Sequence, residues 1–474
     1  MRRHICAGLM IAALILTFSG SAGTVAEESP ASRVILSWTE ASEATTQTFA
    51  WTANQSESTY VEYIAESVYT GGNTSCSKIY GTGTPTRVTS DVFYRYEATA
   101  TGLSPNTEYR YRVVAGNIEG EWKKFTTAPQ RSESFSFLYF GDIQVAANMA
   151  VELSAWSALT QTAYSNNPGA AFGLLGGDIV DSGLDSANWS TFLSAAEPVF
   201  SKIPLMPVNG NHESNHIGGK PLAYMDIFAL PRNGPEGFAE EFYSFDYGSV
   251  HITAVNTHVY SGEQNLNAAD YDAIKAWIKA DIESSRATWK IVMLHHPVYA
   301  VASDGVSAKV LENWAPVFED TGVDLVFEGH QHVYARSMPL YQGRVDYDKG
   351  IVYIMGVSGS KFYDTANESL MARVIYRESC YQVADVDGNS MSVSTYSANG
   401  ALLDMVSLNA RAREYVYVPG DMNDDNELTS DDLSLLIDSI LGRDFSNPAA
   451  DVNGDGAIDV RDAHSLLISL GGGR

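Results

Sequence analysis

The strongest constraint on the fold is a series of apolar runs between residues 134 and 410, each of which ends in a polar cluster. The runs are SFSFLYFGD, AAFGLLGGD, IPLMPVNGN, WKIVMLHHP, VDLVFEGHQ and GIVYIMGVSG. Helical patterns, such as DYDAIKAWIKADIESS and VLENWAPVFEDTG, lie between several of them. Strands that alternate with helices predict an α/β core, and the polar clusters place candidate catalytic groups at the strand ends.

Residues 31–129 carry a different pattern, in which short strands of alternating residues are separated by turn signals. The strands are RVILSWTE, QTFAWTAN, TYVEYIAES, VFYRYEATATGL, EYRYRVVAG and EWKKFTTA. Six such strands within roughly 100 residues predict an immunoglobulin-like β-sandwich. The stretch LSPNTEYRYRV resembles the E–F corner of fibronectin type III domains, with Leu103, Pro105 and Tyr109 in the family's places.

Composition and the N-terminal residues narrow the class of protein. A chain of 474 residues is too long for one ordinary core, and its hydrophobic fraction of 45% is that of globular domains. The net charge of −27 argues against nucleic acid or an anionic membrane surface as the partner. Residues 1–26 are typical of an export signal, with a basic start, an apolar run and small residues after it. The apolar run of roughly 14 residues is shorter than a membrane span requires. We therefore expect a secreted protein without a membrane span, in which Cys76 and Cys380 either pair or are both free.

The polar clusters of the α/β segment contain the residue types of metal sites. They hold Asp142, Gln144, Asp178, Asp181, Asn211, His212, Glu213, His295, His296, His330 and His332. A single aspartate at a strand end is more often a helix cap than a metal ligand. Carboxylate, amide and imidazole groups in five successive clusters, each after an apolar run, instead predict a metal site.

The order of these clusters, D-x-Q, GDxxD, GNHE, HxP and GHxH, resembles the metallophosphoesterase superfamily. GHQHVYARSMP and the fibronectin-like segment in front resemble its purple acid phosphatase branch. The resemblance implies a four-layer αββα sandwich, with two sheets face to face between helices, and a dinuclear centre of Fe, Mn or Zn. It implies Asp178 as the bridging ligand and a metal-activated water or hydroxide as the nucleophile. The other implied ligands are Asp142 and His332 for the first metal, and Asn211, His295 and His330 for the second.

Two residues depart from the purple acid phosphatase pattern. Asp181 stands where these enzymes have the tyrosine that binds iron and gives their colour, so we expect no such colour. An aspartate at this place in the protein phosphatase branch holds the GNH histidine, so we expect Asp181 to orient His212, which protonates the leaving alcohol. The alternative is that Asp181 binds metal through water. Gln144 stands where the superfamily has histidine or glycine, and it either binds a hard cation or hydrogen-bonds the bridging water.

The C-terminal segment, residues 419–474, contains a repeat with a period of 30. Each copy has the D-x-N-x-D pattern of a calcium loop, followed by an amphipathic helix. The expected ligands of two Ca²⁺ ions are Asp421, Asn423, Asp425, Glu427 and Asp432 in the first copy, and Asp451, Asn453, Asp455, Ala457 and Asp462 in the second. The repeat resembles a small α-helical dockerin, which binds a cohesin domain of a scaffold protein, as in cellulosomes. The family's recognition positions are Ser430, Asp431, Val460 and Arg461.

The sequence therefore predicts a multidomain, secreted, dinuclear metal-dependent phosphoesterase. Its segments are the signal 1–26, the fibronectin-like domain 31–129, the metallophosphoesterase domain 134–410 and the dockerin 419–474. The resemblance favours a small phosphomonoester as substrate and extracellular attachment to a cohesin-bearing scaffold. Two alternatives remain open: hydrolysis of phosphodiesters or nucleotides at the same metals, and a docked binding module without turnover. A calcium-stabilised cap without a partner is the alternative for the tail.

Overall fold

The computed structural model describes residues 31–39, 43–53, 58–71, 75–130, 134–144, 150–214, 219–411, 419–422, 428–441 and 448–471. The predicted export signal and the candidate calcium ligands Asn423, Asp425 and Glu427 lie outside these ranges. Within them, no helix is both long enough and apolar enough to cross a membrane. Cys76 and Cys380 are not joined by a disulfide.

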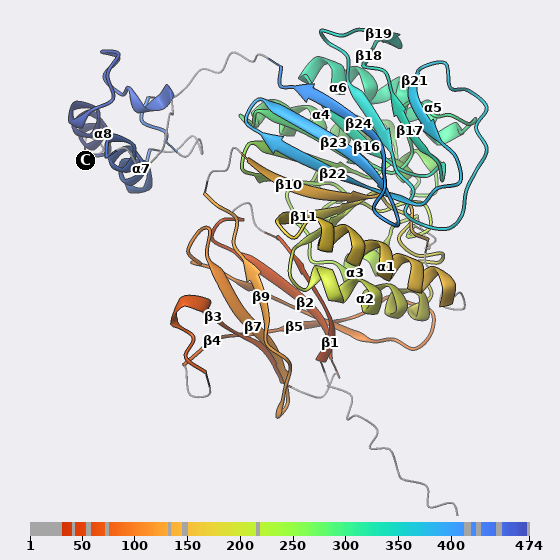
Figure 1. Ribbon diagram of the computed structural model, residues 1–474, viewed down its shortest axis with the longest axis horizontal. Helices are drawn as coiled ribbons and strands as arrows, with labels where there is room; N and C mark the ends of the chain where they lie inside the picture. The colour runs from red at the N-terminus through yellow and green to blue at the C-terminus, as the bar shows by residue number, and fades with distance from the viewer. Residues whose placement is uncertain are drawn as a thin grey trace, which may run out of the picture.

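The N-terminal domain consists of two antiparallel sheets packed on a shared core (Figure 1). The first sheet has the order β1 (Ala31–Ser37), β2 (Gln47–Ala53), β6 (Tyr94–Ala100) and β5 (Thr82–Pro85). The second has the order β4 (Ser77–Tyr80), β3 (Thr59–Ala65), β7 (Glu108–Ala115) and β8 (Ile118–Glu119), with β9 (Lys123–Thr126) also on β7. A 3₁₀ turn, η1 (Glu66–Val68), follows β3. The Ser104 N–H donates to the Tyr109 hydroxyl at 2.9 Å, which closes the expected fibronectin-like corner.

The following domain is built on two larger sheets that face each other (Figure 1). One has the order β12 (Leu205–Pro207), β11 (Ala170–Leu175), β10 (Ser134–Phe140), β22 (Cys380–Asp387), β23 (Ser390–Ser397) and β24 (Leu402–Asn409). The other has the order β13 (Tyr243–Tyr247), β14 (Val250–Val255), β15 (Trp289–Leu294), β16 (Leu325–Glu328), β20 (Val352–Met355), β17 (Tyr334–Ser337) and β21 (Met371–Ile375). A small hairpin pairs β18 (Leu340–Tyr341) with β19 (Arg344–Val345).

Helices form the outer layers of this domain. On the first sheet lie α1 (Ala150–Asn166) and α2 (Ser186–Phe200), and on the second lie α4 (Ala268–Ser284), α5 (Gly305–Asn313) and α6 (Ala315–Thr321). Short helical turns, α3 (Leu222–Ile227) and η2 (Thr257–Ser261), lie in the connections. Strand β15 shows why four layers form: Ile291 and Met293 pack into the core between the sheets, whereas Val292 and Leu294 pack against the helices. The expected αββα sandwich is confirmed.

One expected helix is divided in two. The stretch VLENWAPVFEDTG reads as one helical segment, but α5 ends at Asn313 and α6 begins at Ala315. Pro316 lies in the first turn of α6, where its missing N–H costs no hydrogen bond and its ring restricts the residue before it. After the break, α6 places its own Val317 and Phe318 in the core that it shares with Ile274 and Ile278 of α4.

The N-terminal domain and the sandwich share a packed interface. Trp38 lies among Phe172, Phe245 and Tyr247 of the sandwich, with ring centroids 5.7–5.8 Å apart. The Tyr111 hydroxyl donates to the Ser201 carbonyl at 2.6 Å. These buried contacts fix the first domain against the second.

The C-terminal segment forms a separate small helical unit. It contains α7 (Ser430–Ile440), η3 (Pro448–Ala450) and α8 (Val460–Gly471). Its core is made of Met422, Leu435, Leu436, Ala450 and Leu466. Thr429 and Asp432 form a capping box that starts α7. The Thr429 side chain accepts a backbone N–H of the first helical turn, and the Asp432 side chain accepts the Thr429 N–H.

Candidate metal centre

Five strand ends bring the candidate ligands to one edge of the sandwich. Strands β10, β11 and β12 run parallel in one sheet, and β14, β15, β16 and β20 run parallel in the other. The carboxyl ends of parallel strands meet at the same edge. The two sheets join there through a parallel bridge between Asp142 and Val357. A Cβ on Gly141 would lie 2.2 Å from the Gly356 carbonyl, so the close approach of the two sheets requires glycine at position 141.

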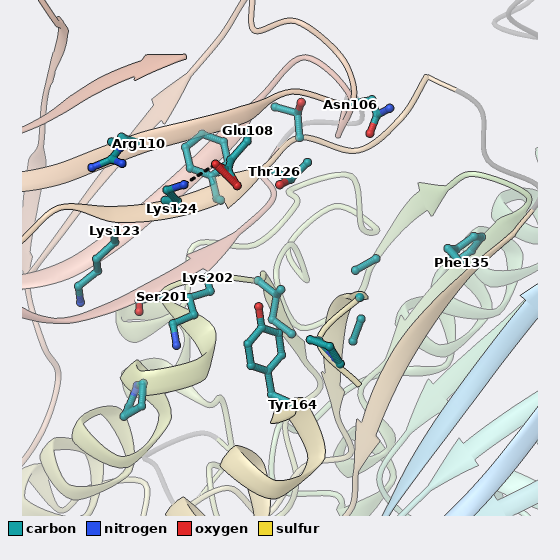
Figure 2. A pocket seen from close by; sticks show the side chains of 18 of the residues that line it. Asn106, Glu108, Arg110, Lys123, Lys124, Thr126, Phe135, Tyr164, Ser201 and Lys202 are labelled. Atoms are coloured by element: carbon teal, nitrogen blue, oxygen red, sulfur yellow. Dashed lines mark hydrogen bonds and ion pairs between the residues drawn. The ribbon is translucent and has the colours of Figure 1, made fainter. Parts of the chain in front are cut away.

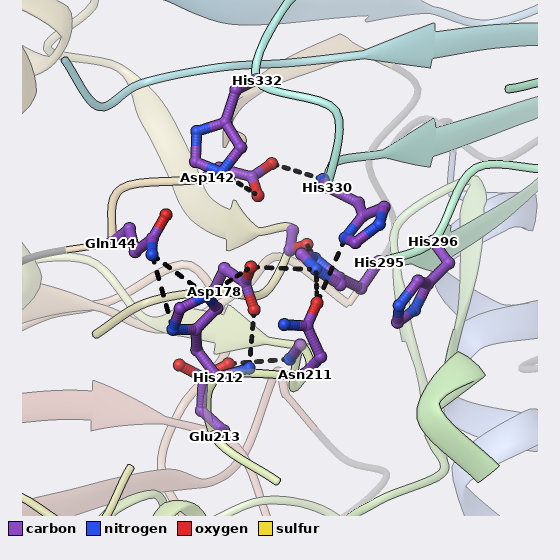
Figure 3. Close-up of polar contacts among 12 residues, drawn as sticks. Asp142, Gln144, Asp178, Asn211, His212, Glu213, His295, His296, His330 and His332 are labelled. Carbon is purple, nitrogen blue, oxygen red and sulfur yellow. Dashed lines mark hydrogen bonds and ion pairs between the residues drawn. The ribbon is translucent and has the colours of Figure 1, made fainter. Parts of the chain in front are cut away.

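One group of donor atoms converges around His295 (Figure 3). Its Nε2 lies 3.1 Å from Asn211 Oδ1 and 3.3 Å from Asp178 Oδ2. The Nδ1 atom of His330 lies 3.1 Å from the same Asn211 oxygen. Asn211 Oδ1 thus lies 3.1 Å from a ring nitrogen of both His295 and His330, and Asp178 contacts the same His295 ring; these are the residues expected at the second metal.

A second group lies on the other side of Asp178. His332 Nε2 is 3.6 Å from Asp142 Oδ1, while Asp142 Oδ2 accepts the His330 backbone N–H at 2.6 Å. Ligand atoms of Asp142, Asp178 and His295 all lie within 4.8 Å of one another. Asp178 thus stands between both groups, which is the place of a bridging carboxylate.

Hydrogen bonds of His295 and His332, and an acidic neighbour of His330, leave one nitrogen of each ring for a metal. His295 Nδ1 donates to the Gly176 carbonyl at 2.9 Å, and His332 Nδ1 donates to the Lys361 carbonyl at 3.2 Å. His330 Nε2 faces Asp304 Oδ2 at 3.6 Å. The remaining nitrogens are the ones that point into the centre, which is the arrangement of metal-binding histidines.

The backbone at the centre adopts a conformation that side chains generally avoid. Gln144, Asp178, His330 and His332 all have positive φ, between 45° and 72°. Such left-handed residues cost of order 1 kcal/mol or more each, and they cluster at functional sites. Here they direct side chains from the strand ends inward.

The buried charges of the centre call for cations. Burial raises the pKa of the Asp142 carboxyl to about 7, and its Oδ1 is buried without a hydrogen-bond partner in the described chain. Burial also opposes ionisation of Asp178, but His295 and His212 outweigh it and lower its pKa. Burial lowers the pKa of His330 to about 4 and of His332 to about 3, so both rings are neutral and able to bind metal at pH 7. The donors present fit two transition-metal ions.

His212 and the two departing residues form a network beside the metal ligands (Figure 3). His212 Nδ1 donates to the backbone carbonyl of Asp181 at 2.5 Å, while the Asp181 carboxylate is 3.9 Å away. The amide nitrogen of Gln144 lies 2.8 Å from Asp181 Oδ1 and 3.0 Å from His212 Nε2. Asp181 therefore orients His212 through its main chain, and its carboxylate is held by Gln144.

Gln144 directs its amide oxygen to a lysine. The Lys361 ammonium donates to Gln144 Oε1 at 3.2 Å. Since Asp181 requires the NH₂ group and Lys361 the oxygen, the orientation of the amide is defined. Of the two sequence expectations for Gln144, this geometry favours a hydrogen-bonding role over direct metal binding.

Two neighbouring residues support the centre. Buried Glu213 accepts the backbone N–H groups of Ile179, Val180 and Gly210 at 2.7–3.1 Å, which fastens the GGD and GNH segments together. His296 Nδ1 lies 2.8 Å from the Thr257 hydroxyl, and burial lowers its pKa well below the ordinary value. Glu213 thus supports the two ligand segments, while His296 also lies within 4.8 Å of ligand atoms of His295 and His330.

Sequence reasoning missed three residues of this edge. Gln331 accepts the N–H groups of Val301 and Ala302 at 2.8 and 3.0 Å, so it ties the loop after HHP to the GHQH motif. Asp304 faces His330, and Lys361 faces Gln144. Gln331 could have been noticed between the two histidines, but no local pattern marks Asp304 or Lys361.

In the second expected calcium loop, carboxylates accept backbone N–H groups of the loop. Asp451 accepts the N–H groups of Asp455 and Gly456 at 3.0 and 2.9 Å, and Gly456 has the left-handed φ of 82° that such loops need. Asp462 Oδ1 accepts the Asn453 N–H at 3.1 Å. In the first loop, Asp421 lies 3.2 Å from Arg286 of the sandwich. Calcium binding by the two loops stays a prediction.

A cleft lies between the N-terminal domain and the sandwich (Figure 2). It measures about 1250 Å³ and is lined by residues of both domains, including Lys123, Tyr164 and Lys202. None of the candidate metal ligands lines it. A smaller pocket of about 630 Å³ includes Asp304 and therefore adjoins the centre.

Three family models match the chain. The calcineurin-like phosphoesterase family matches residues 135–334, the purple acid phosphatase N-terminal domain matches residues 31–127, and the dockerin type I domain matches residues 419–469. Together these matches span most of the sequence.

Relatives and solved structures agree with these matches. An uncharacterised protein of Mycobacterium tuberculosis is 28% identical over 51% of this chain and 50% of its own length. Purple acid phosphatase 22 of Arabidopsis thaliana is 26% identical over 55% of this chain and 57% of its own length. The chain thus spans about half the length of the curated relatives it matches.

The solved structures show the same fold. Purple acid phosphatase from yellow lupin seeds has a TM-score of 0.65 at 16% identity, covering 81% of this chain and 75% of its own. The structure of PhoD has a TM-score of 0.58 at 11% identity, covering 80% of this chain and 92% of its own. The chain therefore contains a purple acid phosphatase N-terminal domain, a calcineurin-like phosphoesterase domain and a type I dockerin domain, and it is similar to purple acid phosphatases.

Proposed function

We propose that this protein is a secreted dinuclear metallophosphatase that hydrolyses small phosphomonoesters and is attached through its dockerin to a cohesin-bearing scaffold. The observation that carries the catalytic part is the convergence of Asp142, Asp178, Asn211 and three histidines at one edge of the sandwich. Asp142 and His332 would hold one metal, Asn211, His295 and His330 the other, and Asp178 both.

The chemistry divides between the metals and the protein's own residues. When bound, two metal ions supply Lewis acidity and lower the pKa of bound water. His212 is 24% exposed in its side chain, and its Nδ1 donates to Asp181. Nε2 is the ring nitrogen left to carry a proton to the leaving alcohol, which requires the Gln144 NH₂ group, now 3.0 Å away, to move off it. A donor of this kind is needed for turnover but not for binding alone, which favours an enzyme over a binding module.

The surroundings of the centre leave room for the organic part of a substrate. The pocket of about 630 Å³ shares Asp304 with the centre and is lined mainly by small and apolar residues, among them Val301, Ala302 and Leu311. A phosphate bound at the metals could extend its alcohol into this space. Purple acid phosphatases among the relatives also support an ester phosphatase.

Comparison of two chromogenic esters tests the catalytic proposal. Purified protein should hydrolyse p-nitrophenyl phosphate faster than bis-p-nitrophenyl phosphate after loading with Mn²⁺, Zn²⁺ or Fe. Chelation should abolish turnover. Asp178→Ala should lower the amount of bound metal, and it should lower kcat by at least roughly 10²-fold. Faster hydrolysis of the diester would favour a phosphodiesterase. Metal binding in a ratio of about two per chain without any turnover would favour a binding module.

The dockerin supports a cohesin partner. Its candidate recognition residues, Ser430, Asp431, Val460 and Arg461, are all exposed at the starts of α7 and α8. Capture by an immobilised type I cohesin domain, in calcium but not in EGTA, would support this part of the proposal. Equal retention on a blank resin would contradict it.

A further inference from the structure

Lys361 places an ammonium group at the rim of the metal centre. The side chain is exposed, and in the described chain its ammonium is not within 4.0 Å of any carboxylate. Several basic groups of this domain have acidic partners, as Lys220 has Glu241 and Arg336 has Asp404. Others in the described chain, such as Lys309 and Lys349, have no ion-pair partner either, so what distinguishes Lys361 is its place beside the metal centre. An uncompensated cation in a protein of net charge −27 is a candidate for binding an anion.

The main chain fixes Lys361 beside a candidate metal ligand. Its carbonyl accepts the Nδ1–H of His332 at 3.2 Å. Two residues on, the Tyr363 N–H donates to the His332 carbonyl at 3.3 Å, and the Tyr363 ring lies 4.7 Å from the imidazole. The segment that carries Lys361 is therefore held against the centre at three points.

The side chain of Lys361 points toward the candidate proton donor. Its ammonium donates to Gln144 Oε1 at 3.2 Å, and the nitrogen of the same amide lies 3.0 Å from His212 Nε2. It also lies 5.1 Å from the centre of the Tyr363 ring. Lys361 is thus two short contacts from the atom that faces the substrate, and its flexible stem allows the ammonium to leave Gln144 for a closer anion.

We propose that Lys361 is a specificity-determining residue that binds a non-bridging phosphate oxygen and favours phosphomonoesters over phosphodiesters. This inference rests on the proposed phosphatase function. A phosphomonoester near neutral pH carries nearly two negative charges, whereas a diester carries one. The hydrogen bond that an ammonium donates to a phosphate oxygen is therefore stronger with the monoester than with the diester. The two departures of the sequence, Gln144 and Asp181, complete the network that holds this lysine in place.

Substitution of Lys361 by a neutral residue tests the inference in the full chain. Lys361→Gln should lower kcat/KM for p-nitrophenyl phosphate roughly tenfold and change that for bis-p-nitrophenyl phosphate less than about threefold. Lys361→Arg should retain most of the preference for the monoester. Lys349→Gln provides the control, because Lys349 is also exposed over a tyrosine ring but lies away from the centre.

A binding measurement gives a second readout. Calorimetric titration of the metal-loaded protein with inorganic phosphate should show a Kd roughly tenfold weaker for Lys361→Gln, with no change in metal content or in binding of diethyl phosphate. Equal losses for the two esters, or a loss of bound metal, would overturn the inference and leave the phosphatase proposal intact. A wild-type protein that binds phosphate without turnover would refute only the phosphatase proposal. Absence of both binding and turnover would refute the two together.

Discussion

At the residue scale, the two departures from the purple acid phosphatase pattern depend on each other. The amide of Gln144 gives the Asp181 carboxylate a donor at 2.8 Å, which a glycine at this position could not supply. The main chain of Asp181 meanwhile fixes His212. The Asp181 side chain is 53% exposed, so its carboxylate is solvated as well as hydrogen-bonded by this amide.

Gly210 provides a test of how tightly the ligands are packed. A Cβ at this position would lie 2.2 Å from Asp178 Oδ1 and 2.4 Å from the Asp178 nitrogen. We expect Gly210→Ala to destabilise the fold by about 1–3 kcal/mol and to weaken metal binding, measured by thermal unfolding and metal analysis. Gly169→Ala is the control, because nothing lies within 4 Å of a Cβ there. Equal stability of the two variants would contradict this packing.

At the element scale, the parallel strands position the site and the helices support them. Strand β14 illustrates this, because its His251 lies between Asp246 of β13 and Asp281 of α4, at 2.8 and 3.1 Å. Burial opposes protonation of His251, but the hydrogen bonds to both carboxylates outweigh it and raise its pKa to about 9. The charged ring therefore links two strands and a helix.

The pH dependence of stability follows from the direction of this shift. A pKa raised above the ordinary 6.5 means that the charged ring stabilises the fold fully below pH 6.5, and that this contribution is lost as the pH rises through about 9. His251→Gln should cost about 1–2 kcal/mol at pH 6, since exposed Asp246 is partly screened, and less at pH 10. Urea unfolding at both pH values measures this. The same cost at both values would contradict it, and the exposed His464 provides the control.

At the scale of the whole molecule, the N-terminal domain is part of the structure that holds the metal centre. Trp38 belongs to the same buried cluster as Phe137 and Leu174, which lie on the strands that end in Asp142 and Asp178. Unfolding of the first domain would uncover this shared core. We therefore expect residues 31–411 to unfold together.

Removal of the Trp38 side chain tests this coupling. Trp38→Ala should destabilise the whole unit by about 3–5 kcal/mol and lower the temperature of one calorimetric transition, which also releases the metals. Tyr347→Ala serves as the control, because Tyr347 is 83% exposed and should change stability by less than about 0.5 kcal/mol. Two separate transitions, with only the smaller one shifted, would show that the domains unfold independently.

The sequence by itself determined the classes of the domains and most of the candidate ligands. The apolar runs, their polar ends and the calcium loops are patterns of a few neighbouring residues. Such patterns reflect local requirements, namely strand burial, the turn after a strand and the geometry of a loop around an ion. Motifs such as GGDIVD and GHQH can therefore be read without knowledge of the fold.

Only the tertiary structure decided which atoms meet. Asp142 and His332 are far apart in the sequence, and they face each other because β10 and β20 join at their carboxyl ends. The orientation of Gln144 depends on Lys361, an exposed residue in a loop with no local signal. The physical reason is that hydrogen bonds and charges act over a few ångströms in space. The order of strands in two packed sheets sets that proximity, and no short stretch of sequence contains it.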